Sequence, residues 1–212
     1  ALTAAGVLSF EDGLKLAKLY GDAVQEAAKA KAQAVLGLVG LEEPKVVELC
    51  AEAAKEEGAG AVCEITQKLF PQGFSVGGTE KSILALEKLA KGAGALHAKQ
   101  VSKSNRNGSL LEPVQEKVGA ALDEMLPSMK PPKTTVYMTA SATPMRPGTD
   151  PKDIVELLKK QVTGLLLWES TVKAMIGEGV SEFYEVGPMR QLKAMMRRID
   201  PEVWKDMKNI EG

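Results

Sequence analysis

The feature that most constrains the fold is a regular alternation of strand and helix patterns between residues 33 and 102. The pattern predicts a strand, a helix, two strands, a helix and a strand, in that order. This is the β-α-β-β-α-β order of the split βαβ unit of ferredoxin-like domains. Pro44 at the start of the first helix and the pair Gly92 and Gly94 after the second agree with these boundaries. The predicted strands are 34–39, 61–66, 74–77 and 96–101, and the helices are 44–55 and 80–91.

Outside this unit the sequence predicts many helices and only two good strands. Residues 1–5 are expected to end a helix that stops at Gly6, and Ser9 is expected to cap the next one. Residues 180–199 predict a buried strand, a turn at Gly187-Pro188 and a helix, which is the usual join of an α/β sheet. The other expected helices are 10–31, 111–126, 151–162 and 169–176, the other strand is 134–139, and residues 144–148 are expected to form a loop.

Two strands cannot cover this many amphipathic helices in a complete layer. We therefore expect an α/β protein with a partial α/β layer, an exposed sheet edge and an inserted ferredoxin-like subdomain. The expected division is 1–32 for the helical start of the large subdomain, 33–102 for the insert, and 103–212 for the remainder and the C-terminal tail. In that tail, Trp204 is expected to place its ring in a surface groove.

The composition is that of a water-soluble protein. Its 27 basic and 28 acidic residues are interspersed, which argues against a nucleic-acid partner, and no apolar run is long enough for a transmembrane segment. Cys50, Cys63 and the only histidine, His97, are too few for a zinc site, so no metal is predicted and both cysteines are expected to be reduced.

Several segments together resemble the malonyl-CoA:acyl carrier protein transacylases. They follow one another in order and span nearly all 212 residues. The resemblance implies an α/β-hydrolase-like acyltransferase layer with a small inserted subdomain, in agreement with the architecture expected from the patterns above, and it implies no cofactor. The segments are Ala-Ala-Gly-Val-Leu-Ser-Phe-Glu-Asp at 4–12, Val62-Cys63, Leu-Phe-Pro at 69–71, Gly77-Gly78, Gln161 with Trp168, and Phe-Tyr-Glu-Val-Gly-Pro at 183–188.

Members of this family use a serine in a Gly-His-Ser-Leu-Gly elbow, a histidine that activates it and an arginine that pairs with the malonyl carboxylate. The resemblance places the elbow before Ala1, the arginine at Tyr20, and the histidine at Arg106 or Asn107, depending on one gap. Tyrosine carries no positive charge at neutral pH, arginine stays protonated, and asparagine has no proton to exchange usefully. The sequence therefore predicts no catalytic residue in this chain.

A vestigial binding pocket is the remaining site that the resemblance implies. Gln67 stands where the family has an asparagine, and Met189 stands where it has a glycine after Gly187-Pro188. Gln161 retains the family residue, and its simplest role is a hydrogen bond that orders the junction between helix and loop. His97 lies several residues before the family position, and an ordinary strand histidine is the simpler interpretation.

Three hypotheses for function follow. The first is a catalytically silent acyltransferase-like protein, a pseudoenzyme that acts as a structural or binding subunit of a larger assembly, with other protein subunits covering the open sheet edge. The second is a fragment or divergent form of an active transacylase of fatty-acid or polyketide synthesis. The third is a sensor that binds acyl carrier protein or a coenzyme A thioester without reaction. The start at Ala1 favours an organelle, plastid or mitochondrion, over the cytoplasm.

Overall fold

A computed structural model describes residues 1–211, and its mixture of helices and strands confirms the predicted α/β class. The helices are α1 (Phe10–Ala30), α2 (Glu43–Glu57), α3 (Glu80–Gly92), α4 (Glu112–Met125), α5 (Pro151–Thr163), α6 (Trp168–Gly177), α7 (Gln191–Ile199) and α8 (Pro201–Asp206). The strands are β1 (Gln33–Val39), β2 (Cys63–Phe70), β3 (Gly73–Thr79), β4 (His97–Ser102), β5 (Val136–Met138), β6 (Thr143–Met145), β7 (Leu166–Leu167), β8 (Tyr184–Val186) and β9 (Lys208–Ile210).

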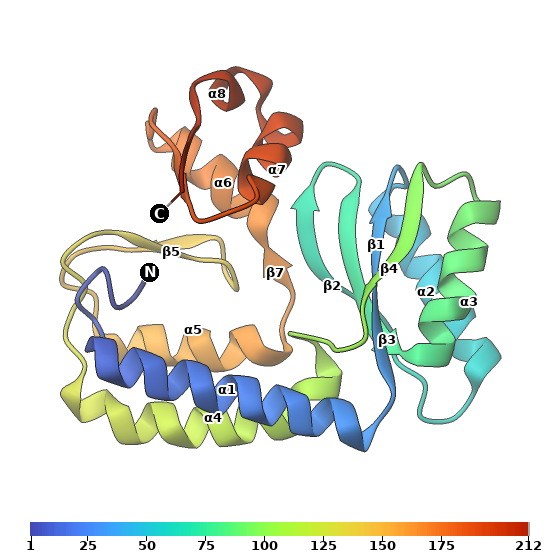
Figure 1. The fold of residues 1–212 in the computed structure, drawn as a ribbon, viewed down its shortest axis with the longest axis horizontal. Coiled ribbons are helices and arrows are strands. Elements are labelled where there is room, and N and C mark those ends of the chain that lie inside the picture. The colour runs from blue at the N-terminus through green and yellow to red at the C-terminus, as the bar shows by residue number, and fades with distance from the viewer. Residues whose placement is uncertain (212) are drawn as a thin grey trace.

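The largest sheet is built from the segment with the regular alternation. Its strand order is β4-β1-β3-β2-β7; the first four strands are antiparallel to one another, and β7 pairs with β2 in parallel. Helices α2 and α3 pack on each other and on the sheet, at the right of Figure 1. Leu36, Leu38, Ile83 and Leu86 are fully buried between the sheet and these helices. All six elements predicted here are present, which agrees with the split βαβ order.

Two glycines of β3 allow neighbouring backbone and side chains to approach the sheet closely. A Cβ atom on Gly78 would lie 2.1 Å from the carbonyl oxygen of Val62, and one on Gly77 would lie 2.4 Å from Oδ1 of Asn105. Neither position can therefore hold a side chain without a shift of its neighbours. Gly77 thus allows the loop after β4 to rest against the sheet, and Gly78 allows the close approach of the backbone at Val62.

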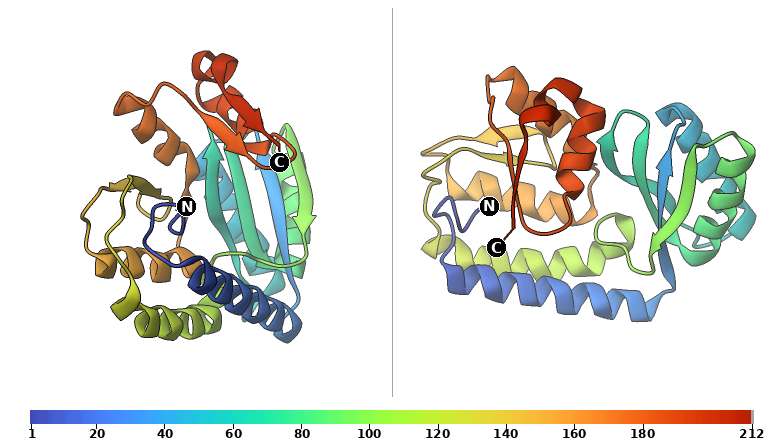
Figure 2. Two further views of the ribbon diagram at one scale, coloured as in Figure 1. Left: turned by 60° about the vertical axis from the view of Figure 1, so that its left-hand side comes forward. Right: turned by 45° about the horizontal axis from the view of Figure 1, so that its top comes forward.

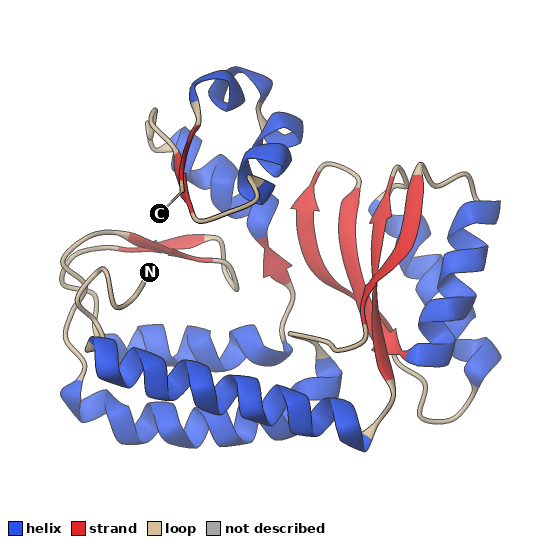
Figure 3. Cartoon of the chain, viewed as in Figure 1, coloured by secondary structure: helices blue, strands red, loops and turns tan. Residues whose placement is uncertain are grey.

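A second layer consists of α1, α4 and α5, which run side by side in Figure 3. Their apolar faces share one core with the β5-β6 hairpin, and Leu111, Leu122 and Ile154 are fully buried in it. The predicted cap of α1 is confirmed, because Oγ of Ser9 accepts a hydrogen bond of 3.0 Å from the backbone nitrogen of Asp12.

The C-terminal segment, residues 164–211, forms a third group, orange to red in Figure 2. Its buried core is small and consists of Val172, Met196 and Met207. The buried strand predicted over 180–186 is wrong in both length and burial. Only Tyr184–Val186 is a strand, and Val186 is 79% exposed, because among the described residues β8 pairs solely with β9 in a two-stranded parallel ribbon. Of the three β8 residues only Glu185 is buried, against the first turn of α7.

Other sequence expectations are corrected in detail. Residues 1–5 form turns and no regular helix, with one hydrogen bond from the Ala5 nitrogen to the Ala1 oxygen. The expected loop at 144–148 begins inside strand β6, which pairs with β5. Outside the inserted unit there are five strands in place of two, of which β7 joins β2 of the large sheet. The division at residues 32/33 and 102/103 stays a prediction.

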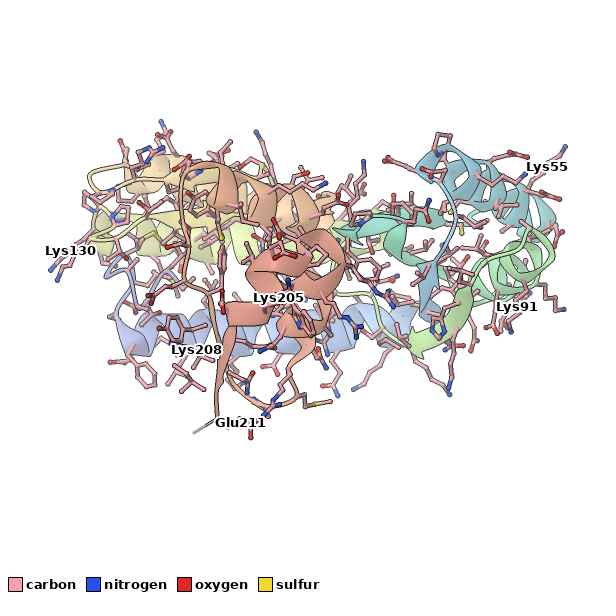
Figure 4. All side chains as sticks on the ribbon, turned by 90° about the horizontal axis from the view of Figure 1, so that it is seen from above. Lys55, Lys91, Lys130, Lys205, Lys208 and Glu211 are labelled. Carbon is pink, nitrogen blue, oxygen red and sulfur yellow. The ribbon has the colours of Figure 1, made fainter. Side chains whose placement is uncertain are left out.

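Charged side chains project around the whole outline of the molecule, as the labelled lysines at its two ends show in Figure 4. Across residues 1–211, no helix combines the length and the apolar character needed to cross a membrane.

The two cysteines are free thiols, of which Cys50 is buried and Cys63 is half-buried. The hydrogen bond with Cys50, together with burial, raises the pKa of the Cys63 thiol.

Candidate functional site

A cleft of about 700 Å³ lies where α1, β2, the loop after β4, the β5 strand and the end of α5 meet. It brings together five of the seven residues singled out in the sequence, which come from segments far apart in the chain: Tyr20, Gln67, Arg106, Asn107 and Gln161. The rest of its wall is largely apolar and includes Leu16, Val118, Leu122, Met138, Leu158 and Trp168. A largely apolar concave surface with a few convergent polar groups is typical of a small-molecule site.

Tyr20, on the side of α1 facing the cleft, uses its hydroxyl within the protein. The phenol donates a hydrogen bond to the backbone carbonyl of Arg106. Burial raises the pKa of Tyr20, and the nearby Arg106 guanidinium opposes this only in part. The phenol therefore stays protonated at neutral pH and ties α1 to the loop after β4.

Asn107 is buried, with 3% of its surface exposed, and its amide makes three hydrogen bonds. Nδ2 donates to the carbonyl of Thr66 at 2.6 Å and to the carbonyl of Gly164 at 3.2 Å, and Oδ1 accepts from Nε2 of Gln67 at 3.1 Å. These bonds hold β2, the loop after β4 and the end of α5 together. Asn107 and Gln67 therefore have a structural role that accounts for their polarity.

Arg106 and Gln161 differ from these three residues, because their polar groups are free. Arg106 is exposed, and within residues 1–211 its guanidinium makes no ion pair or side-chain hydrogen bond. It is the only charged side chain among the residues that line the cleft. Gln161 also lines the cleft, and the hydrogen bond expected to order the helix-loop junction is not made in the described part of the chain.

The structure does not bring the other predicted residues to this cleft. Gly187 and Met189 lie in the turn between β8 and α7, and neither lines the cleft. His97 is exposed at the first position of β4, opposite Val39. Among the residues that line the cleft there is no serine, cysteine, histidine, aspartate or glutamate, so no nucleophile paired with a base is assembled here.

Two residues that support the site were given no role from the sequence: Asn105 was not singled out, and Trp168 was named only as part of the family resemblance. Asn105 is 2% exposed, and its backbone nitrogen donates to Oε1 of Gln33 at 3.1 Å, which fixes the loop on the cleft side of the sheet. Trp168 lines the cleft, and its buried Nε1 has no acceptor among the described residues. The polar run at 102–108 indicated a loop, but nothing local in it distinguishes the buried asparagines from the exposed arginine.

Comparison of the sequence with known proteins identifies consistent relatives. The mitochondrial malonyl-CoA-acyl carrier protein transacylase of Homo sapiens is 30% identical over 223 residues, covering all of this chain and 55% of that protein. The malonyl CoA-acyl carrier protein transacylase of Bacillus subtilis is 27% identical over 201 residues, covering 94% of this chain and 61% of that protein. This chain is a relative of the malonyl-CoA:acyl carrier protein transacylases. No protein-family model matches the chain.

Solved structures agree with this relationship. The acyl carrier protein S-malonyltransferase of Vibrio cholerae is 26% identical and superposes with a TM-score of 0.85, covering 100% of this chain and 65% of that one. A malonyl-transacylase in complex with a type II polyketide synthase acyl carrier protein has the same fold, with a TM-score of 0.86 at 22% identity. The acyltransferase fold predicted for this transacylase relative is thus confirmed. The chain spans about 55–65% of the length of these relatives.

Proposed function

We propose that this transacylase relative binds acyl thioesters in the cleft and does not itself transfer the acyl group. The observation that carries the proposal is the state of Asn107. This residue is one of the two that stand where the family resemblance places the histidine, and all three of its polar contacts are made to Thr66, Gly164 and Gln67. A carboxamide is too weak a base to take a proton near neutral pH, and both N–H groups of this amide are already used as donors, so Asn107 cannot act as a general base.

The proposed partners are a coenzyme A thioester or an acyl carrier protein, with further protein subunits in a larger assembly. The names of the relatives support the carrier protein, and one structural neighbour is a complex of a malonyl-transacylase with its carrier protein. Of the two organelles proposed, mitochondrion and plastid, a mitochondrial relative supports the first. The exposed side chains of Val186 and Ile210 in the β8-β9 ribbon support a protein neighbour, since exposed apolar side chains and free strand edges favour association.

The test combines a binding assay with a transfer assay. Titration calorimetry with acetyl-CoA and malonyl-CoA is expected to show binding, while mass spectrometry of a holo acyl carrier protein incubated with the chain and malonyl-CoA is expected to show no acylation above background. The Bacillus subtilis relative is the positive control for transfer. A turnover of about 1 per second or more would overturn the proposal, because typical enzymes reach that rate.

A second candidate is a divergent form or fragment of an active transacylase whose nucleophile lies outside residues 1–212. The observation that favours it is that Ala1, Leu2 and Thr3 line the cleft, so a segment joined before Ala1 would leave from the cleft wall. Native mass spectrometry of the protein from its own source tests this. A longer chain that acylates the carrier protein, and loses this activity when its elbow serine is changed to alanine, would favour the second candidate over the first.

A further inference from the structure

A second, smaller cavity lies inside the C-terminal segment. It has a volume of about 200 Å³ and is lined by residues of α6, α7, β8 and the chain just before β9. The three buried apolar residues of this segment, Val172, Met196 and Met207, all line it, and so do Met175 and Phe183. None of the described residues that line it carries a charge. An apolar cavity of this kind stays dry and favours an apolar ligand.

Trp168 joins this cavity to the cleft. Its side chain, at the first position of α6, lines both spaces and is therefore their common wall. Helix α6 contacts both β5 of the cleft and α7 of the C-terminal segment (Figure 1). We infer that the cavity binds the uncharged hydrocarbon tail of an acyl thioester whose thioester group lies in the cleft, and that Trp168 moves to admit the tail. This inference rests on the proposed binding of acyl thioesters.

Within residues 1–211, no hydrogen bond fixes the indole of Trp168. Its Nε1 atom is buried and has no acceptor there. A buried N–H group without an acceptor is unfavourable, so a rotation of the ring breaks no hydrogen bond and can gain one. The carbonyl oxygen of a thioester that lies beside the ring is an acceptor of the kind that the indole lacks. The free amide of Gln161, in the same cleft, can donate to that carbonyl as well.

The size and the lining of the cavity suit a flexible saturated chain. A dry apolar cavity of about 150 Å³ can hold benzene, so the larger cavity in this protein has room for about six carbon atoms. The methionines at 175, 196 and 207 have unbranched side chains that adapt to ligands of different shape. A tail that ends in a carboxylate is excluded, because an unpaired charge is costly to bury. The ligand class is therefore a medium-chain acyl thioester of about eight carbons, with about six of them in the cavity.

The test compares the affinities of the full chain for acetyl-CoA, butyryl-CoA and octanoyl-CoA by titration calorimetry. Each methylene that enters the cavity is expected to raise the affinity by about 2-fold to 4-fold, so octanoyl-CoA is expected to bind at least about 10-fold more tightly than butyryl-CoA. Val172→Phe fills the cavity from α6 and is expected to reduce this preference to less than about 3-fold. Ser170→Phe is the matched control, because it adds the same ring at an exposed position of α6 that lines neither space.

A second measurement uses the wild type and does not depend on the folding of a variant. In protein with isotope-labelled methionine methyl groups, octanoyl-CoA is expected to shift the resonances of Met175, Met196 and Met207. Acetyl-CoA is expected to leave these resonances unchanged, because its acyl group has no tail to reach the cavity. Met189 is the internal control, since it is exposed in the turn after β8 and does not line the cavity.

The outcomes separate this inference from the proposed function. Equal binding of butyryl-CoA and octanoyl-CoA would overturn the inference and leave the proposed function standing. A length preference without a shift of the methionine resonances, or one that Val172→Phe does not reduce, would also overturn the inference, because it would place the tail on the apolar wall of the cleft. If the wild type binds none of the three esters, both proposals fail.

Discussion

The sheet region, residues 33–102, and the C-terminal segment, residues 164–211, are both mixed α/β units, yet they bury very different cores. Fourteen buried apolar residues lie between the sheet and its two helices, whereas the C-terminal segment buries three. In the sheet region the helices that follow β1 and β3 return to cover their own strands. In the C-terminal segment β8 and β9 form a ribbon in which Val186 and Ile210 stay exposed, and Met189 in the turn after β8 is exposed as well. The sheet region therefore covers its strands with its own helices, whereas the ribbon is covered only in part, where Glu185 meets α7.

In both regions a carboxylate accepts hydrogen bonds from the first turn of a helix. In the sheet region, Glu57 at the end of α2 accepts hydrogen bonds from the backbone nitrogen and Oγ of Ser82, in the first turn of α3. In the C-terminal segment, Glu185 of β8 accepts from the backbone nitrogens of Leu192 and Lys193 in the first turn of α7, each at 2.9 Å. Each carboxylate satisfies free N–H groups at a helix N-terminus, where negative charge is also favoured.

The largest expected change in the free energy of unfolding comes from truncating buried side chains in the two cores. Ile83→Ala removes a fully buried side chain from the sheet region and is expected to lower the free energy of unfolding by about 2–5 kcal/mol. Met196→Ala is expected to cost at most about 2 kcal/mol, because the half-exposed neighbours of Met196 can collapse into the space. Urea denaturation of both variants measures this, and equal losses would contradict the contrast between the two cores.

The second-largest loss of stability is expected from removing the buried carboxylate of Glu185 in the C-terminal segment. Glu185 is 5% exposed, and Glu185→Ala is expected to cost about 1.5–3 kcal/mol, the range for hydrogen bonds to a charged group. Hydrogen exchange of the α7 amides should show the loss locally. The control is Glu182→Ala, which removes an exposed carboxylate that bonds only to the Tyr184 hydroxyl. Unchanged protection of α7 in the Glu185 variant would show that the carboxylate does not hold the helix.

A stabilising change is expected at the turn between β8 and α7. Met189 has a φ of +84°, in the left-handed region that glycine occupies without a steric cost. Met189→Gly is expected to raise the free energy of unfolding by about 1 kcal/mol, since relief of the strain exceeds the greater entropy loss of glycine. Met189→Ala is the control, because it removes the exposed side chain and keeps the Cβ atom. Equal effects of the two variants in thermal denaturation would exclude backbone strain as the cause.

The smallest change in the free energy of unfolding is expected for Glu57, the capping carboxylate of the sheet region. This change depends on pH. Burial alone would raise the pKa of Glu57, but hydrogen bonds from Ser82 and Thr79 outweigh it, and the folded-state pKa is lowered. Its contribution is therefore complete above the unfolded pKa of about 4.3 and is lost as pH falls through the lower folded value. Glu57→Gln is expected to cost at most about 1 kcal/mol near pH 7.

The measurement is a series of denaturation curves between pH 7 and pH 3. The gap between the wild type and Glu57→Gln should close on the acid side of the series. Glu56→Gln is the control, since Glu56 is an exposed neighbour that accepts no hydrogen bond from another side chain in the described structure. A gap that stays constant across the series would refute a role for the ionised form of Glu57.

Sequence reasoning was most accurate where the chain covers its own strands. The first strand was predicted over 34–39 and is 33–39, and the second helix of this unit was predicted over 80–91 and is 80–92. It was least accurate for strands whose partners lie far away in the sequence. β2 continues to Phe70 past irregular pairing near Gln67 and Phe70, and β7 has only two residues, too short to show a period.

By itself, the sequence determined the α/β class, the alternating unit at 33–102, the cap of α1 and, through the family resemblance, five residues that meet in one cleft. It could do so because periodicity and capping are local, and because the resemblance transfers positions along the chain. Only the tertiary structure decided that the Asn107 amide is hydrogen-bonded while the Arg106 guanidinium is free, and that two of the three β8 residues stay exposed. Those properties depend on the partners that a side chain or strand meets, and the partners come from distant segments such as α1, the end of α5 and β9.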